Sequence, residues 1–157
     1  MPDMLVSLLN LPPVSPILDQ LSESGIVIRR ANTFESTSIR EFIGLHFSKS
    51  WADEVMPCFS RQPVTLYIAI LDGKIVGFAA FETTCRNFFG PTGVAEIHRA
   101  KGIGKALLIS ALYGLREMGY AYGIIGGVGP EEFYRKTVNA DLIPNSTPGI
   151  YTNLLKR

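Results

Sequence analysis

The stretch Arg-Ala-Lys-Gly-Ile-Gly at residues 99–104 constrains this chain most strongly, because an apolar helical pattern follows it at once. Apolar side chains recur along one stripe, formed by Ile103, Leu107, Ala111, Leu115 and Met118. A helix N-terminus carries unpaired N–H groups and partial positive charge, and glycine lets an anion approach that backbone closely. Arg99, Lys101 and Lys105 add positive charge. The pattern predicts a phosphate or pyrophosphate seat; a tight helix start without a ligand is the alternative.

Two common phosphate motifs do not fit this stretch. The dinucleotide fingerprint Gly-x-Gly-x-x-Gly fails because Leu107 stands at the third glycine position. A Walker A loop fails because Ala106 follows Lys105, so that no hydroxyl is placed for Mg²⁺. An anion site of another class is therefore expected.

Composition narrows the choice of function. The chain has 157 residues, 46% of them hydrophobic and 18% charged, which predicts one domain with a sizeable core. A formal net charge of +1 argues against a broad nucleic-acid surface. Cys58 and Cys85 have no metal-binding spacing, so neither a metal site nor a disulfide framework is expected. The apolar runs are too short to span a bilayer and no signal peptide is recognised, which predicts a cytoplasmic protein without membrane partners.

The remaining pattern predicts a mixed α/β (α+β) fold. Strands are expected over residues 26–30, 65–71, 74–84, 87–94, 121–128, 141–144 and 150–155. Helices are expected over residues 17–24, around 39–47, around 51–59, from the motif to Gly119, and after Pro130. Ser38 with Glu41 is predicted to form a capping box, Ser50 to cap the next helix, and Asp72-Gly73 to form a hairpin turn.

Two motifs in this order resemble the GNAT N-acetyltransferases. Arg99-Ala-Lys-Gly102-Ile-Gly104 matches the family signature Gln/Arg-x-x-Gly-x-Gly/Ala, and EFYRKTVNA at 132–140 is similar to its later helix, where Phe-Tyr-x-Lys is usual. FFGPTGV and STPGIY look like one group of members. The resemblance covers about residues 26–155. It implies a mostly antiparallel sheet, splayed at the strand before the motif, in a domain over residues 26–157 on which an N-terminal arm (1–25) packs.

The resemblance implies acetyl-coenzyme A as co-substrate, with no metal. The residues expected to bind it are Thr92 and Val94, beside the pantetheine arm, and Arg99, Ala100, Lys101, Gly102, Ile103, Gly104 and Lys105, around the pyrophosphate. The interrupted strand suits a splayed edge with free backbone groups. The sequence departs from the family at Gly127, where an asparagine that contacts the coenzyme is common.

Tyr134 matches the family tyrosine that faces the leaving sulfur. Its reference pKa of ~10, against ~8.5 for a thiol, favours hydrogen bonding to the thiolate over full protonation. The oxyanion donor is expected to be a backbone N–H, that of Val94. The general base departs from the pattern, because the strand at 88–94 has no carboxylate; Glu82 is the nearest candidate. Other candidates left open are His46, Asp53, Glu54 and a chain of waters.

The first hypothesis is an N-acetyltransferase that moves the acetyl group directly to a primary amine of a small or amino-acid-like acceptor. A catalytically weak acyl-coenzyme A-binding regulatory domain is the alternative, and a structural domain without coenzyme is a third. The acceptor pocket is expected to be aromatic and built from residues 45–60 and 87–91. A homodimer is left open.

Overall fold

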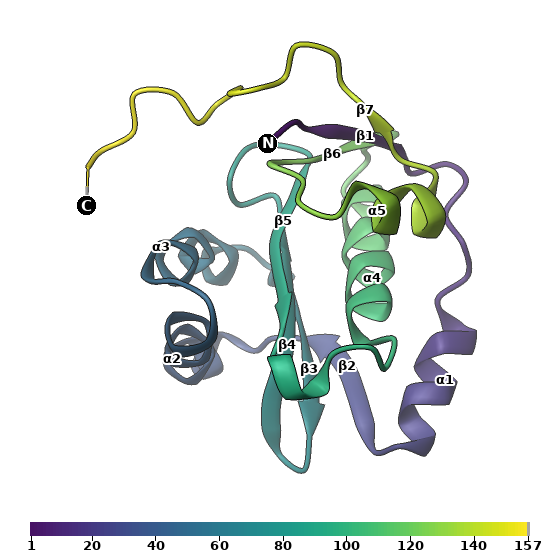
Figure 1. Ribbon diagram of the computed structural model, residues 1–157. Coiled ribbons are helices and arrows are strands. Elements are labelled where there is room, and N and C mark those ends of the chain that lie inside the picture. Colours follow the sequence, from purple (N-terminus) through teal and green to yellow (C-terminus); the bar gives the residue numbers. More distant parts are fainter. Residues whose placement is uncertain (157) are drawn as a thin grey trace.

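A computed structural model describes residues 1–156, which form one seven-stranded sheet with helices on both faces (Figure 1). The strands are β1 (Met4–Ser7), β2 (Ile26–Arg30), β3 (Leu66–Leu71), β4 (Lys74–Phe81), β5 (Phe88–Val94), β6 (Tyr122–Ile125) and β7 (Asp141–Leu142). The α-helices are α1 (Ser15–Glu23), α2 (Ser36–His46), α3 (Lys49–Glu54), α4 (Ile103–Glu117) and α5 (Glu131–Val138). Short 3-10 helices are η1 (Thr33–Glu35), η2 (Met56–Ser60) and η3 (Glu96–His98).

The sheet is splayed in its middle, as the resemblance implied. The strand order is β2-β3-β4-β5-β6-β1-β7, and β5–β6 is the parallel pair while the other pairs are antiparallel. Strands β5 and β6 pair only at Phe88 with Ile124 and Phe89 with Ile125. Beyond Phe89 the two strands part, so the rest of β5 keeps one edge free of strand pairing.

The predicted turns are confirmed, and two predicted caps are wrong. Asp72 and Gly73 have φ values of 51° and 72°, which is the geometry of a tight hairpin turn. Ser48, not Ser50, caps α3 by accepting from the Trp51 N–H at 3.1 Å. The capping box lies at Asn32 and Glu35 rather than at Ser38 and Glu41. The reason is that α2 begins at Ser36, which places Ser38 inside the first turn.

The prediction for the sheet edge is partly wrong. A strand is present at Asp141–Leu142, but residues 150–155 form none. Instead β1 lies between β6 and β7. Met4 and Val6 are fully buried in the core, whereas Leu154 and Leu155 are exposed, so β1 is the segment that gains from entering the sheet. The division of the chain at residue 25 stays a prediction.

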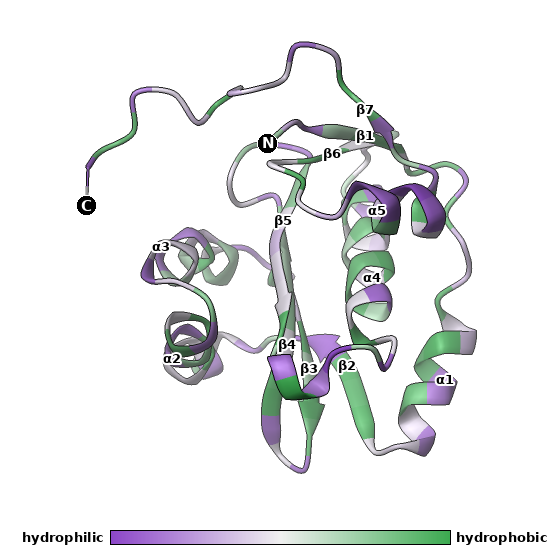
Figure 2. Cartoon of the chain, viewed as in Figure 1, coloured by the Kyte–Doolittle hydropathy of each residue, from purple (hydrophilic) through white to green (hydrophobic). Residues whose placement is uncertain are grey.

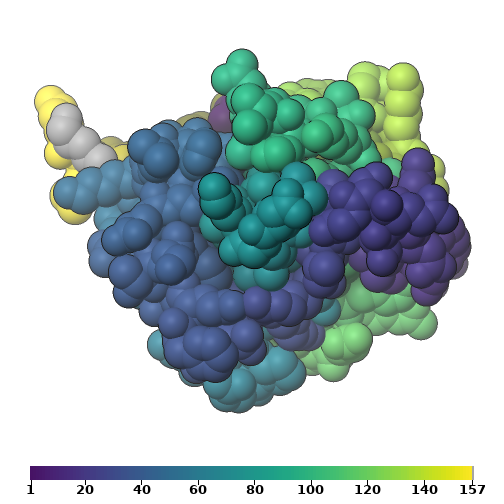
Figure 3. Space-filling model, turned by 90° about the horizontal axis from the view of Figure 1, so that it is seen from below, coloured from purple at the N-terminus to yellow at the C-terminus, as the bar shows by residue number. Residues whose placement is uncertain are grey.

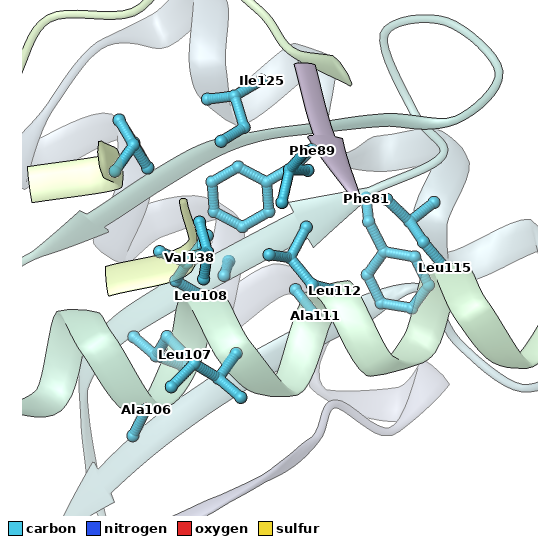
Figure 4. Packing of buried hydrophobic residues seen from close by; sticks show 14 of the residues in the cluster. Phe81, Phe89, Ala106, Leu107, Leu108, Ala111, Leu112, Leu115, Ile125 and Val138 are labelled. Carbon is cyan, nitrogen blue, oxygen red and sulfur yellow. The ribbon is translucent and has the colours of Figure 1, made fainter. Parts of the chain in front are cut away.

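The core has two parts, one on each face of the sheet. On one face α2 and α3 pack over Phe78 and Leu66; on the other, α4 packs against Phe81 and Phe89 (Figures 1 and 4). Figure 2 shows the apolar colouring concentrated on the strands and on α4. Helix α4 is buried on nearly all sides because α1 and α5 cover what the sheet does not. This packing fixes the start of α4 relative to β5.

Two helical glycines should respond to alanine in opposite directions. A Cβ atom on Gly114 would lie 2.4 Å from Cζ of the buried Phe81, whereas one on Gly44 would lie 3.9 Å from Cβ of Ala52. Gly114→Ala is expected to lower the free energy of unfolding by about 1–2 kcal/mol through overpacking. Gly44→Ala should raise it by up to about 1 kcal/mol through helix propensity. Urea unfolding of both variants checks this; equal shifts would contradict the packing.

Candidate active site

Helix α4 begins with an N-terminus that has no side-chain cap. Gly102 is the N-cap residue, and the Ala106 N–H makes the first helical hydrogen bond to its carbonyl oxygen, at 3.1 Å. The N–H groups of the first turn, at Ile103, Gly104 and Lys105, therefore point out of the helix without a helical acceptor. Together with the helix dipole they form a site suited to an anion.

The loop before α4 is held in a conformation that favours glycine. Gly102 has a φ of 88°, and a Cβ atom there would lie 3.3 Å from Cδ1 of Ile17 in α1. Figure 3 shows α1, in purple, next to this green segment. The Arg99 Nε donates to the Val94 carbonyl oxygen at 3.0 Å. The loop is thus tied to β5 on one side and packed on α1 on the other.

The free edge of β5 presents backbone donors. The Ala95 N–H donates to the Val76 carbonyl oxygen at 2.8 Å, on the β4 side. Because N–H direction alternates along a strand, the N–H groups of Thr92 and Val94 point to the opposite edge, where β6 has parted from β5. The Thr92 hydroxyl is occupied separately, donating to the Phe78 carbonyl oxygen at 3.0 Å. The free edge is therefore made of main-chain groups.

One large cavity joins the start of α4 to this edge. The main cavity has a volume of about 710 Å³. Its lining includes eight of the nine residues expected to bind the coenzyme: Thr92, Val94, Arg99, Ala100, Gly102, Ile103, Gly104 and Lys105. Lys101 is exposed and does not line it. His98 does, and its buried Nδ1 has no hydrogen-bond partner among the described residues.

Tyr134 enters the main cavity from α5. Its side chain is 6% exposed and packs edge-to-face against Phe89 and Phe133, with ring centroids 6.3 and 5.1 Å away. Burial raises the pKa of its hydroxyl to about 12. The phenol is therefore neutral at pH 7 and is available as a hydrogen-bond donor to the cavity.

The Glu82 carboxylate is buried and hydrogen-bonded within the fold and does not face a cavity, as a general base would be expected to do. It is 4% exposed, and its carboxylate accepts from the Tyr120 hydroxyl at 2.7 Å and from the Asn87 N–H at 2.6 Å. It does not line the main cavity or the smaller cavity beside it. These contacts hold the loop between β4 and β5, which is a structural task.

A second cavity of about 400 Å³ adjoins the main one. It is lined by Met1, Trp51, Glu54, Thr84, Phe88, Phe89, Gly90, Pro91, Gly126, Gly127, Pro148 and Tyr151. Trp51, Phe89 and Gly90 are among the residues that line both cavities. The sequence singled out its aromatic side chains and weighed Glu54, but it missed Tyr151. The motif STPGIY at residues 146–151 was the one sequence feature that pointed to the segment that carries Tyr151.

A sequence model of the acetyltransferase (GNAT) family matches residues 34–135, which is about two thirds of the chain. The chain belongs to this family. Among proteins with curated descriptions, none matches it.

Solved structures agree with the GNAT fold. A region described as a GCN5-related glucosamine N-acetyltransferase, in a fungal multi-domain GH3 β-N-acetylglucosaminidase, is similar with 16% identity and a TM-score of 0.72, over 90% of this chain and 19% of that one. A GCN5-related N-acetyltransferase from Sphaerobacter thermophilus has 18% identity and a TM-score of 0.70, and the match covers 90% of this chain and 48% of that one. A GNAT family acetyltransferase from Brucella melitensis, in complex with acetyl-CoA, has 20% identity and a TM-score of 0.56, and the match covers 75% of this chain and 86% of that one. This GNAT chain thus spans about a fifth of the length of the first of these proteins and about half of the length of the second.

The described residues contain neither a membrane-spanning helix nor a cluster of metal ligands. Within residues 1–156, no helix of this GNAT chain is long and apolar enough to cross a bilayer. The same residues contain no cluster of three or more histidine, cysteine or acidic side chains placed to hold a metal ion.

The pKa of Tyr134 predicts a pH dependence of stability. Because the folded pKa is about 12 and the unfolded value is ~10, the folded state holds this proton more tightly, and stability falls as pH rises above 10. Between pH 9 and 11 the wild type should lose about 1 kcal/mol more unfolding free energy than Tyr134→Phe. Urea unfolding at both pH values measures this, and equal losses would contradict the burial of the hydroxyl.

Proposed function

We propose that the protein is an N-acetyltransferase that moves an acetyl group from acetyl-coenzyme A directly to the primary amine of a small acceptor. The observation that carries the proposal is the main cavity, because one space connects the open N-terminus of α4, the free edge of β5 and Tyr134. The acetyl-CoA bound to the Brucella melitensis relative supports the same ligand.

The residues of the main cavity fit the coenzyme in three places. The N–H groups of Ile103, Gly104 and Lys105 suit a pyrophosphate, with Arg99 and Lys105 adding positive charge. The Val94 N–H, on the free edge beside the start of α4, suits an amide of the pantetheine arm. His98 offers a buried nitrogen without a partner among the described residues. Metal-free chemistry of this kind needs only such hydrogen bonds and positioning.

The chemistry at the end of this cavity is acyl transfer. Acetyl-coenzyme A supplies a thioester whose carbonyl carbon an amine can attack. Thr92 is the residue of the free edge that lies nearer along β5 to Phe89 and Tyr134, and its N–H, rather than that of Val94, suits the developing oxyanion. Tyr134, neutral at pH 7, donates to the sulfur as the carbon–sulfur bond breaks. With a hydroxyl pKa of about 12 it stabilises the thiolate by a hydrogen bond, and the proton that completes the thiol comes from the attacking nitrogen or solvent.

A regulatory acyl-coenzyme A-binding domain is the second candidate. It is favoured by one observation, the engagement of Glu82 by Tyr120 and Asn87, because this leaves β5 and its neighbour without a free carboxylate. It would bind the coenzyme in the same cavity but would not turn over with any amine. The two functions therefore differ in turnover and not in coenzyme binding.

Coenzyme binding can be tested at Gly104. A Cβ atom there would lie 3.8 Å from Cγ2 of Val94, an ordinary contact, so Gly104→Ala is a fitting control. Gly104→Glu adds a negative charge where the pyrophosphate is expected. Calorimetric titration with acetyl-coenzyme A should show binding by wild type and by Gly104→Ala, and at least about 100-fold weaker binding by Gly104→Glu. Absence of binding by folded wild type would overturn the proposal.

A further inference from the structure

The second cavity has a wall formed by the C-terminal segment, which lies outside the residues that the family model matches. The C-terminal segment runs over the top of the molecule toward α3 (Figure 1). It brings Pro148 and Tyr151 to the second cavity. The Tyr151 ring lies over Gly126 and Gly127: a Cβ atom on these glycines would lie 3.3 Å from the Tyr151 hydroxyl and 3.4 Å from its Cε2. A side chain longer than that of alanine at position 127, such as the asparagine that is common in the family, would extend toward this ring.

The opposite wall carries one carboxylate. Glu54, half-buried at the end of α3, accepts a hydrogen bond from the Thr84 hydroxyl, while its backbone carbonyl oxygen accepts from the Thr83 hydroxyl at 2.5 Å. These two bonds fix the Glu54 side chain and backbone against the loop after β4. Burial, together with the nearby carboxylates of Glu54 and Asp3, raises the pKa of the Tyr151 hydroxyl, which is therefore a neutral donor at pH 7.

The charge and shape of this cavity select for one kind of acceptor. Among the described residues that line it, Glu54 is the one carboxylate, and none is lysine, arginine or histidine. The rest of its wall is formed by Met1, by glycine, proline and threonine residues, and by the rings of Trp51, Phe88, Phe89 and Tyr151. Aromatic rings attract a cation and accept an apolar body.

We infer that the second cavity holds an apolar primary monoamine of the arylalkyl type, and that Glu54 binds its ammonium group and accepts its proton. The inference rests on the proposed function. The Glu54 carboxylate takes one proton from the ammonium. The nitrogen lone pair forms the carbon–nitrogen bond, the carbon–sulfur bond breaks, and its electron pair stays on sulfur. The second nitrogen proton ends on that thiolate, directly or through solvent, giving amide and thiol.

The cavity itself supplies a probe of amine binding. Trp51 is the single tryptophan of the chain and lines both cavities. 2-Phenylethylamine should therefore change Trp51 fluorescence without any coenzyme, and ethanolamine, which has a hydroxyl group where 2-phenylethylamine has a phenyl ring, should bind about tenfold or more weakly. Glu54→Gln keeps an acceptor oxygen for Thr84, so it should fold. It should weaken amine binding about tenfold or more through loss of the charged hydrogen bond.

Turnover provides the second readout, with Asp53→Asn as the matched control. Asp53 is exposed, pairs with Arg40 at 2.9 Å and does not line the cavity. With acetyl-coenzyme A and 2-phenylethylamine, Glu54→Gln should lower kcat/KM about 100-fold or more while acetyl-coenzyme A affinity stays unchanged. For Asp53→Asn, both kcat/KM and the affinity for acetyl-coenzyme A should stay within about twofold of the wild-type values.

Three results would overturn the inference, and one would overturn only the proposed function. Equal kcat/KM for 2-phenylethylamine and ethanolamine would contradict the selection for an apolar, aromatic body. Equal activity of Glu54→Gln and Asp53→Asn would remove Glu54 from the reaction. Binding of acetyl-coenzyme A without transfer to 2-phenylethylamine would refute the acceptor class. Amine binding that depends on Glu54, in a protein that binds no coenzyme, would support the cavity and refute the acetyltransferase.

Discussion

The parting of β5 from β6 is the constraint on which the rest of this structure depends. A sheet normally satisfies both edges of an inner strand, and here one edge of β5 is left without a strand after Phe89. Those N–H groups need a partner, and the start of α4 lies at the same opening with its own unpaired donors. Burial of α4 among α1, α5 and the sheet holds the two sets of donors in fixed relation. A ligand with amides at one end and phosphates at the other complements both.

Both ends of the chain help to form the second cavity, although they are far in sequence from the other residues that line it. β1 enters the sheet between β6 and β7, and the Asp3 carboxylate accepts from the Gly127 N–H at 2.8 Å. The Asp3 N–H donates in turn to the Ser146 hydroxyl, also at 2.8 Å, which ties the C-terminal segment to β1. Tyr151 then lies over the glycines at 126 and 127. The wall opposite Glu54 is thus a product of long-range packing.

Local chemistry made the center of the fold predictable from sequence. The apolar stripe of α4, the hairpin turn at Asp72-Gly73 and the glycines of the motif each act within a few residues, so a pattern can find them. The sheet edge was predicted wrongly because apolar residues at 150–155 looked like a strand, and only burial of Met4 and Val6 decides which segment enters. Glu82 is a candidate general base in the sequence because it is the carboxylate nearest to β5 along the chain. Its hydrogen bonds to Tyr120 and Asn87 depend on contacts that sequence distance does not reveal.

Amide hydrogen exchange at single-residue resolution, with and without acetyl-coenzyme A, tests the central claim most directly. The account predicts that the coenzyme slows exchange at the N–H groups of Thr92 and Val94 and in the first turn of α4, because it takes the place of the missing strand. The Gly93 N–H, which faces β4, and the amides of α2 should change little. Tight binding of the coenzyme that leaves Thr92, Val94 and the start of α4 unprotected would contradict the account.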